Sequence, residues 1–444
     1  MSNKTSWVLA LLLMGSSMAI GAPTIGVNPP AIATTETGTV QITATGVMGT
    51  SVILRLYVDA NGNGLIDPPA DYVIWTDVVA DNVADWSPNM FSDTNVAVGA
   101  YTVDVRLFSP LEFPYTAGSY IWEAEDSQNA STDTTMFSVT QTTQVQSVSG
   151  TVRDSSTTFG VPGAFVVLLP FCDGGDEADR VYSTFADENG AFTIQVPADV
   201  ACRNRIVLGA KPGYLTPFAQ LPNVFLDGTS QFTLQDPGIT AGTWTVTGNL
   251  QYSSGALTGS GIPGAFMLAN FGDGPPLMSI AFTDENGDYS FELDDGAWDV
   301  EAPEDGISTR GAVHLQDLVS VNVSGGSTSF PTLSLPAANA YFEGTLRDDG
   351  GLPVAGRWVG AFRNDACGAE CYDSSTLTRA DGTYSIGVIG PTPTATYGYQ
   401  LDAFIAAVEE GAPYFTNPGD AVNQMRTIDR CYEAAGLPLR GLDL

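Results

Sequence analysis

Basic residues are scarce in this chain of 444 residues. It holds 16 Lys and Arg against 50 Asp and Glu, a net charge of −34, and its lysines are Lys4 and Lys211. A surface with this charge repels the phosphates of nucleic acids and of anionic membranes, so the composition argues against both as partners. Most carboxylates are expected to form a solvated acidic surface, while a minority are candidates for binding cations.

Histidine is almost absent, with His314 as the single example. A zinc peptidase needs several histidine ligands, and a Ser-His-Asp or Cys-His site would have to use this one residue. A pair of carboxylates that cleaves glycosides is compatible with the composition, but short repeated domains leave no room for a large catalytic barrel. We therefore expect a protein that is not an enzyme.

The five cysteines lack the paired spacing of a structural zinc site. Cys367 and Cys371 have no second Cys or His pair to complete four ligands. Isolated cysteines fit an oxidising compartment instead, where Cys172 and Cys202 are candidates for one disulfide. Cys367, Cys371 and Cys431 allow one further disulfide and one free thiol, and the sequence leaves the pairing open.

Long apolar runs are limited to the N-terminus. Lys4 precedes an apolar run from Trp7 to Met14, and small residues follow up to Ala22. This pattern predicts a secretory signal peptide over residues 1–22. The run is short for a bilayer span and no second one follows, so we expect no membrane span after signal cleavage. The predicted location is extracellular or at the cell surface, with the periplasm as an alternative.

A pattern of glycine, proline and a tight turn occurs three times. It begins at residues 160–164 (GVPGA), 261–265 (GIPGA) and 351–355 (GLPVA), and each copy leads to a turn at 187–190 (DENG), 284–287 (DENG) or 380–382 (ADG). The copies recur about every 100 residues, which is the size of a small domain. The chain is therefore expected to contain three related domains in series.

Apolar side chains alternate after each of these turns. The alternating residues are Phe192, Ile194 and Val196 in the first copy, Tyr289, Phe291 and Leu293 in the second, and Tyr384, Ile386 and Val388 in the third. A period of two predicts a strand with one face in the core, and Asn-Gly or Asp-Gly supplies the positive φ of a hairpin. The predicted fold class is all-β, with tandem antiparallel β-sandwich domains.

The three repeats resemble the carboxypeptidase regulatory-like domain, a transthyretin-like sandwich that is also grouped with carbohydrate-binding-like folds. The resemblance is carried by the opening glycines Gly150, Gly248 and Gly344, by the Gly-x-Pro segments, and by the Asp-x-Asn-Gly-x-aromatic turns. The third turn departs from it, since Arg379 and Asp381 replace the Asp and Asn of the other two. The resemblance implies three transthyretin-like domains, at 148–238, 243–336 and 337–444, and implies fold better than function.

Residues 23–143 form a first domain of another kind. Apolar and polar residues alternate over 40–44, 52–58 and 101–107, with turn residues between them. This rhythm predicts an antiparallel sandwich, and the layout resembles bacterial immunoglobulin-like (Ig-like) domains.

The sharpest candidate site lies inside this first domain. Residues 59–67 (DANGNGLID) place oxygen-bearing side chains at alternate positions with glycine at the sixth, as a looped calcium site requires. The twelfth position is Ala70 in place of a glutamate, and Asp71 is the substitute. The predicted ligands of a structural calcium ion are Asp59, Asn61, Asn63, Leu65, Asp67 and Asp71. A metal-free hairpin rich in Asx turns is the alternative.

Tryptophans are candidates for sugar-binding platforms, although most lie on strand-like segments where core packing is expected. Trp86, in the loop-like context of residues 84–88 (ADWSP), is the best exposed candidate.

We therefore expect a secreted, non-catalytic protein that acts as an extracellular structural or adhesive component, or that binds carbohydrate or protein. Its partners would be polysaccharide, an extracellular protein or further copies of itself. The alternative function is an accessory subunit of a secreted hydrolase, or a degenerate hydrolase.

Overall fold

The computed structural model describes residues 22–389 apart from internal gaps, the longest of which are 82–92, 107–115, 171–180 and 363–371. Apart from two helical residues, Ile307 and Ser308, every regular element within the described residues is a β-strand, so the all-β prediction is confirmed. The predicted signal peptide and the last part of the third predicted repeat lie outside the described residues. All described residues belong to one unit, which ends at Ile389.

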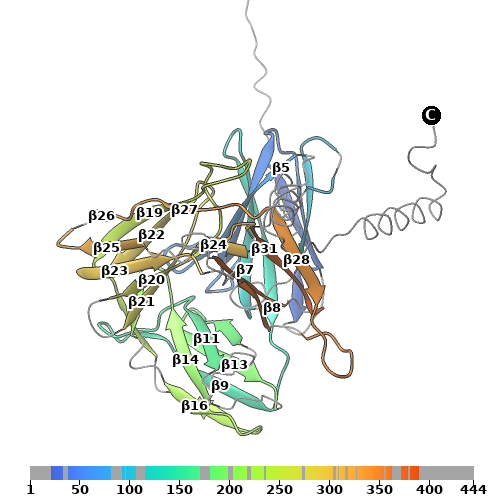
Figure 1. The fold of residues 1–444 in the computed structure, drawn as a ribbon. Coiled ribbons are helices and arrows are strands. Elements are labelled where there is room, and N and C mark those ends of the chain that lie inside the picture. The colour runs from blue at the N-terminus through green and yellow to red at the C-terminus, as the bar shows by residue number, and fades with distance from the viewer. Residues whose placement is uncertain are drawn as a thin grey trace, which may run out of the picture. The chain divides into compact units, whose positions relative to one another are not determined.

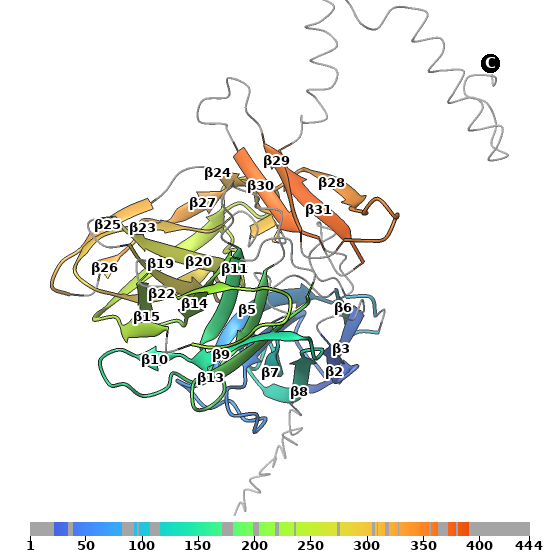
Figure 2. The ribbon, with the colours of Figure 1, turned by 90° about the horizontal axis from the view of Figure 1, so that it is seen from below.

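The N-terminal domain is a sandwich of two sheets (Figures 1 and 2). One sheet has the order β1-β3-β6, and its strands are β1 (Thr24–Asn28), β3 (Thr39–Thr45) and β6 (Ala100–Arg106). The other has the order β2-β8-β7-β4-β5, with β2 (Ala31–Ala33), β8 (Thr132–Thr140), β7 (Gly118–Asp126), β4 (Ser51–Val58) and β5 (Tyr72–Ala80). Only the pair β2–β8 is parallel among these strands. Burial alternates strictly along β4, as the period-two pattern predicts.

The first repeat contains two smaller sheets. The sheet β12-β11-β14-β16 consists of β12 (Tyr182–Phe185), β11 (Phe165–Pro170), β14 (Asn204–Ala210) and β16 (Asn223–Phe225). The sheet β13-β9-β17 consists of β13 (Ala191–Val196), β9 (Gln146–Thr151) and β17 (Gln231–Thr233). Three short strands complete the repeat: β10 (Arg153–Asp154), β15 (Tyr214–Pro217) and β18 (Gly238–Ala241).

The second repeat has the same strand order. Its larger sheet contains β21 (Leu277–Phe282), β20 (Phe266–Phe271), β23 (Gly296–Glu301) and β25 (Val319–Val323). Its other sheet contains β22 (Asp288–Leu293), β19 (Trp244–Tyr252), β26 (Thr328–Ser329) and β27 (Leu333–Leu335). The described strands of the third repeat are β28 (Ala340–Thr345), β29 (Trp358–Phe362), β30 (Tyr372–Leu377) and β31 (Thr383–Val388).

The opening glycine of each repeat lies opposite an aromatic residue on the neighbouring strand. Gly150 pairs with Phe192, Gly248 with Tyr289, and Gly344 with Tyr384. A methyl group on any of these glycines would lie within 3.0 Å of the partner ring. The glycine therefore leaves the space that the ring occupies, which explains why both residues recur in each repeat.

Equivalent backbone hydrogen bonds show that the sequence pattern aligned the start of the third repeat incorrectly with the other two. The N–H groups of Val161 and Ile262 donate to the carbonyls of Val152 and Leu250, and the third such bond runs from Val354 to Leu346. The structural counterpart of Gly160 and Gly261 is thus Pro353, two residues beyond the Gly351 that the sequence pattern selects. A chance Gly-x-Pro at 351–353 produced the mismatch.

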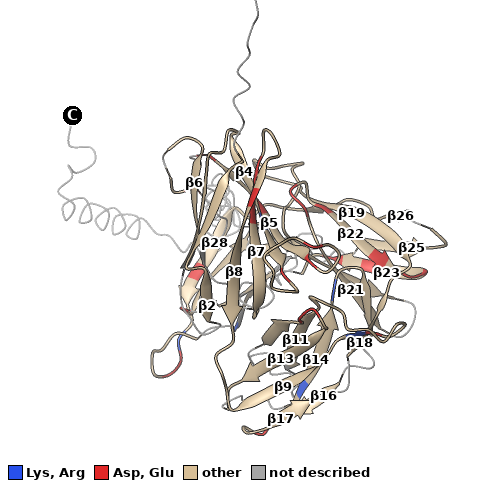
Figure 3. Cartoon of the chain, turned by 180° about the vertical axis from the view of Figure 1, so that it is seen from behind, with Lys and Arg blue, Asp and Glu red and all other residues tan. Residues whose placement is uncertain are grey.

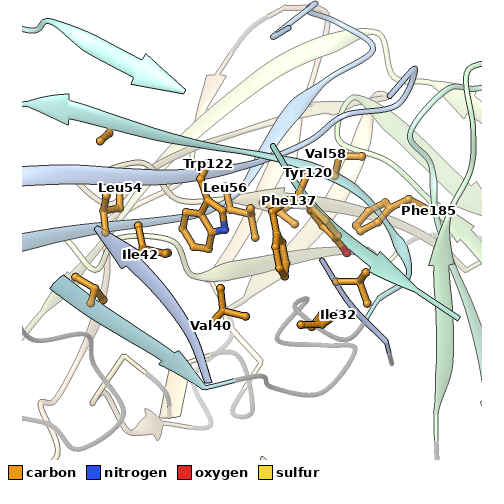
Figure 4. Close-up of a cluster of buried hydrophobic side chains, with 14 of the residues drawn as sticks. Ile32, Val40, Ile42, Leu54, Leu56, Val58, Tyr120, Trp122, Phe137 and Phe185 are labelled. Atoms are coloured by element: carbon orange, nitrogen blue, oxygen red, sulfur yellow. The ribbon is translucent and has the colours of Figure 1, made fainter. Parts of the chain in front are cut away.

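The core of the N-terminal domain extends into the repeats. Tyr120 packs edge-to-face on Phe185 of the first repeat, with ring centroids 5.9 Å apart, and Figure 4 shows Phe185 beside Tyr120 and Phe137. Met278 and Ile280 of the second repeat belong to the same apolar cluster. Burial of apolar area therefore stabilises the junctions as well as the separate sandwiches.

Strand pairing also crosses each junction. Ala117, just before β7, forms a bridge with Thr184 of the first repeat. The strand β15 of the first repeat pairs with β21 of the second, and β24 (His314–Leu315) of the second pairs with β30 of the third. In all three cases the strand just before the turn of a repeat, β12, β21 or β30, pairs with an edge residue or edge strand of the preceding domain.

Candidate functional site

The predicted calcium loop begins where β4 ends. Asp59 is 3% exposed, and its two carboxylate oxygens accept the backbone N–H groups of Asn63, at 3.2 Å, and of Gly64, at 3.0 Å. Gly62 and Gly64 have φ values of +67° and +75°, which other residues rarely adopt. The alternating glycines therefore allow the chain to curl around the Asp59 carboxylate.

A second carboxylate closes the loop from its other end. Asp71, also 3% exposed, accepts the backbone N–H groups of Ala60, at 2.9 Å, and of Asp67, at 2.8 Å. The Asp67 side chain in turn accepts the amide groups of Asn63, at 2.7 Å, and of Asn61, at 3.2 Å.

The loop thus brings all five residues predicted to bind calcium through their side chains into one hydrogen-bonded network. All of them offer hard oxygen donors, which is the donor chemistry that Ca²⁺ prefers. The side chain of Leu65 points to solvent, at 64% exposed, as expected for a residue that would contribute only its carbonyl. Most of the carboxylate oxygens already accept N–H groups, and no cluster of three or more His, Cys, Asp or Glu suited to a metal occurs among the described residues.

The loop lies against the first repeat. A cavity of about 530 Å³ separates them, lined by Asp59 and Asn61 on one side and by Phe185 and Asp187 on the other. Beside it, the hydroxyl of Tyr72 donates to the carbonyl of Gly163 over 2.8 Å.

Lys211 stabilises this contact by hydrogen bonds to both domains. Its ammonium donates to the carbonyl of Pro162, at 2.6 Å, and to the carbonyl of Ala70 in the N-terminal domain, at 3.0 Å, and it lies 5.3 Å from the ring centre of Tyr72. Burial lowers the pKa of Lys211 to about 8, although the nearby Asp71 carboxylate opposes this shift. The only lysine after Lys4 is therefore a buried link between two domains.

Arg310 plays the corresponding part for the second repeat. Its guanidinium donates to the carbonyl of Gly264, at 3.1 Å, and to the carbonyl of Thr76 in the N-terminal domain, at 3.3 Å. It also lies 4.8 Å from the ring centre of Trp75, within the range of a cation–π contact. We call these two contacts, centred on Lys211 and Arg310, the lysine junction and the arginine junction.

A third cation, Arg55 on β4, pairs with three carboxylates. Glu123 and Glu125 come from β7, at 3.0 and 2.5 Å, and Glu285 comes from the turn of the second repeat, at 3.2 Å. Figure 3 shows how few basic residues stand among the acidic ones in the described chain.

The remaining predicted site residues lie elsewhere. Trp86 and the five cysteines Cys172, Cys202, Cys367, Cys371 and Cys431 fall outside the described residues. His314 lies on β24 and pairs through its backbone with Asp373 of the third repeat. The aspartates of the DENG turns accept two backbone N–H groups each, from Asn189 and Ala191 or from Asn286 and Asp288, as the hairpin explanation predicts.

Sequence reasoning missed both junctions. The available signal was the glycine that follows Pro162 and Pro263, because Gly163 and Gly264 recur at the same place in the first two repeats. Both glycines have positive φ, and an added methyl would come within 2.9 Å of the Ala70 carbonyl or 2.3 Å of the Thr76 carbonyl. No helix in the described part of the chain is long and apolar enough to span a membrane.

Neither the protein-family models nor the curated proteins include a match to this sequence. Among solved structures, the chain is similar to the Bacillus anthracis TIE protein, with 10% identity, coverage of 83% of this chain and 68% of that one, and a TM-score of 0.19. A streptococcal ancillary pilin gives 14% identity, 55% and 80% coverage, and a TM-score of 0.20. A tetra-tandem repeat from the extending region of a large adhesion protein gives 14% identity, 83% and 91% coverage, and a TM-score of 0.19. TM-scores of this size do not show a shared arrangement of the chain, so the tandem β-sandwich fold is established by the strands themselves.

Proposed function

We propose that this chain is an extracellular structural or adhesive component whose β-sandwich domains act as one stiff unit. The observation that carries this proposal is the strand pairing across every junction, from Ala117 to β12, from β15 to β21 and from β24 to β30. Domains that share hydrogen-bonded strands and apolar cores resist bending at the junction, unlike domains on a flexible linker.

The resemblance of the repeats to carboxypeptidase regulatory-like domains is part of this proposal. The glycine–aromatic pair, which recurs at Gly150, Gly248 and Gly344, supports three copies of one sandwich. We also propose that the protein is not an enzyme and that it is exported, with polysaccharide, an extracellular protein or further copies of itself as its partner. The strong acidity fits a surface that stays soluble outside the cell.

Calorimetry of the full chain tests the stiff unit. The paired domains should melt in one transition whose calorimetric enthalpy equals the van 't Hoff enthalpy. Several separate transitions would contradict the coupling. Antibodies against the folded protein should label intact cells or the culture medium, and recovery from the cytoplasm alone would contradict export. Turnover of peptides or polysaccharides by the purified chain would overturn the non-enzymatic role.

We further propose that the 59–71 loop binds one structural calcium ion. Asp59, Asp67 and Asp71 would supply the charge, and the side chains of Asn61 and Asn63 with the carbonyl of Leu65 would supply neutral oxygens. The amides of Asn61 and Asn63 both bond to Asp67, so calcium would have to displace these two hydrogen bonds. An ion at this place would stiffen the segment that contacts the first repeat.

Melting curves with calcium and with a chelator test this proposal. Calcium should raise the Tm of the native chain, since a ligand that binds only the folded state stabilises it. The isosteric change Asp67→Asn should abolish the rise, whereas Asp187→Asn, in the turn of the first repeat, should leave it intact. An equal Tm of the native chain under both conditions would leave the metal-free hairpin as the correct alternative.

A further inference from the structure

The chain contains four Asn-Gly pairs, and in each the backbone can attack a side chain. The pairs are 61–62, 63–64, 189–190 and 286–287, and all of them are among the described residues. Glycine has no Cβ to obstruct its own nitrogen, so this nitrogen reaches the side-chain carbonyl carbon of the preceding asparagine more easily than that of any other residue. The four pairs share this sequence, so only the structure distinguishes them.

The reaction begins at the glycine nitrogen. This nitrogen bonds to the Cγ of the asparagine, and ammonia leaves with the proton that the nitrogen carried. Water then opens the resulting five-membered succinimide at either carbonyl, which gives aspartate or isoaspartate. The net change consumes one water and releases one ammonia, and it requires no other reactant. A glycine N–H that donates a hydrogen bond must lose that bond before its nitrogen can attack.

Three of the four glycine N–H groups donate hydrogen bonds. The N–H of Gly64 donates to the carboxylate of Asp59, at 3.0 Å. Those of Gly190 and Gly287 donate to the backbone carbonyl three residues earlier, at 2.9 and 3.1 Å. The N–H of Gly62 has no hydrogen-bond partner among the described residues, and Gly62 is exposed to solvent. The attacking nitrogen is therefore free at the first pair alone.

Asn61 and Asn63 are otherwise closely matched. Both are exposed, and the side-chain oxygen of each accepts the backbone N–H two residues further on, from Asn63 at 3.0 Å and from Leu65 at 2.6 Å. The side-chain amide of each donates to Asp67. An accepted N–H polarises the side-chain carbonyl toward attack in both cases. The two asparagines therefore differ chiefly in whether the nitrogen of the following glycine is held by a hydrogen bond.

We propose that Asn61 is a site of spontaneous conversion to aspartate and isoaspartate in the folded protein, and that its product weakens the 59–71 loop. The conversion replaces an amide that donates to Asp67 with a carboxylate that repels it. Isoaspartate also lengthens the backbone by one methylene where the loop curls around Asp59. The modified loop carries one more carboxylate for any cation that binds there.

Peptide mapping by mass spectrometry tests the site. The full chain is incubated at mildly alkaline pH with a chelator, so that no calcium ion holds the loop. Conversion at Asn61 should be about 3- to 10-fold faster than at Asn63, which is the rate factor of one hydrogen bond. Asn189 and Asn286 should convert as slowly as Asn63.

The same chain unfolded in urea is the control for sequence. All four asparagines should convert at similar rates there, because the hydrogen bonds of the fold are gone. Three results in the folded protein would each overturn the proposal: no conversion at Asn61 in a time that converts the unfolded chain, equal rates at Asn61 and Asn63, or faster conversion at another of the four sites.

Two variants test the attacking nitrogen and the product. Gly62→Ala has room for its methyl, since the nearest atom, the Oγ of Ser119, lies 3.8 Å away. The methyl hinders the nitrogen, so the rate at Asn61 should fall to that at Asn63 or below. Asn61→Asp reproduces the charge of the product, and its Tm with a chelator should be lower than that of the native chain. An unchanged rate in Gly62→Ala would refute the assigned attack, and an unchanged Tm in Asn61→Asp would refute the weakening of the loop.

Discussion

The lysine junction and the arginine junction meet the same need with different residues. In each, a positive-φ glycine of a repeat turn, Gly163 or Gly264, packs against the N-terminal domain. In each, a buried cation then joins a carbonyl of that turn to a carbonyl of the N-terminal domain. The cation also lies over an aromatic ring of β5 in both cases.

The two cations come from different places in their repeats. Lys211 follows β14 directly, whereas Arg310 lies well beyond β23, the strand that corresponds to β14. The two repeats therefore share the geometry of the turn, but they supply the cation from different positions in the chain. Buried carbonyls need a donor, and whichever residue can reach them supplies it.

The largest effect should come from filling the space at the two glycines. Gly264→Ala places a methyl 2.3 Å from the Thr76 carbonyl at a φ of +63°, and should cost about 3 kcal/mol or more. Gly163→Ala, with 2.9 Å to the Ala70 carbonyl, should cost about 2 kcal/mol. Gly325→Ala, with the same φ and open space, is the control at about 1 kcal/mol. Urea unfolding measures all three, and equal losses would refute the role of the contact.

The next largest losses of unfolding free energy should come from removing the two cations, and the loss should differ between the two junctions. Arg310→Met leaves two buried carbonyls without this donor and removes the contact with Trp75, at a cost of about 3 kcal/mol. Lys211→Met also removes the cost of burying an ammonium, so its loss should be smaller, about 1–2 kcal/mol. Urea unfolding of both variants checks the order, and a larger loss for Lys211→Met would reverse the comparison.

The pH dependence should mark the lysine junction alone. The pKa of Lys211 is about 8 in the folded protein and near 10.4 in an unfolded chain. Between these values the unfolded chain binds more protons at this amine, so the contribution of Lys211 to the free energy of unfolding should rise by about 2 kcal/mol from pH 8 to pH 10. Buried tyrosines such as Tyr120, whose pKa is raised by burial, act in the opposite sense near pH 10, so the contribution of Lys211 is read as a difference between variants. Denaturant titrations across this range should show the rise as a difference between the native chain and Lys211→Met, and Arg310→Met should keep it. A rise that persists in Lys211→Met would contradict this assignment.

The smallest effect should come from the ion pair that supports the arginine junction. Glu285→Gln weakens a partly exposed pair with Arg55, and should cost less than about 1 kcal/mol. Glu188→Gln, at the corresponding exposed place in the first repeat, should cost nothing measurable. Thermal melts at low and high salt compare the two, and the cost of Glu285→Gln should shrink as salt screens the pair.

The strand faces could be predicted because burial imposes a period of two on side chains. Phe192, Ile194 and Val196 are all buried, as their alternation requires. The partners of the junction cations could not be predicted, because the acceptors of Lys211 and Arg310 are backbone carbonyls, which leave no mark on the sequence. For the calcium loop, the spacing of Asp59 and Asp67 predicts calcium ligands, and the structure joins these residues in one hydrogen-bonded network. The same spacing also satisfies an Asx-rich hairpin, so it does not reveal the metal.

Lys211 has a practical consequence as the single ε-amine after residue 4. At 6% exposed, it is shielded from acylating reagents while the first repeat stays against β5. Once the two domains part, the amine is exposed and can react, and the burial that lowers its pKa is relieved. The rate at which an amine-specific ester acylates Lys211, followed by peptide mapping, therefore reports the openings of this one contact in the unaltered protein.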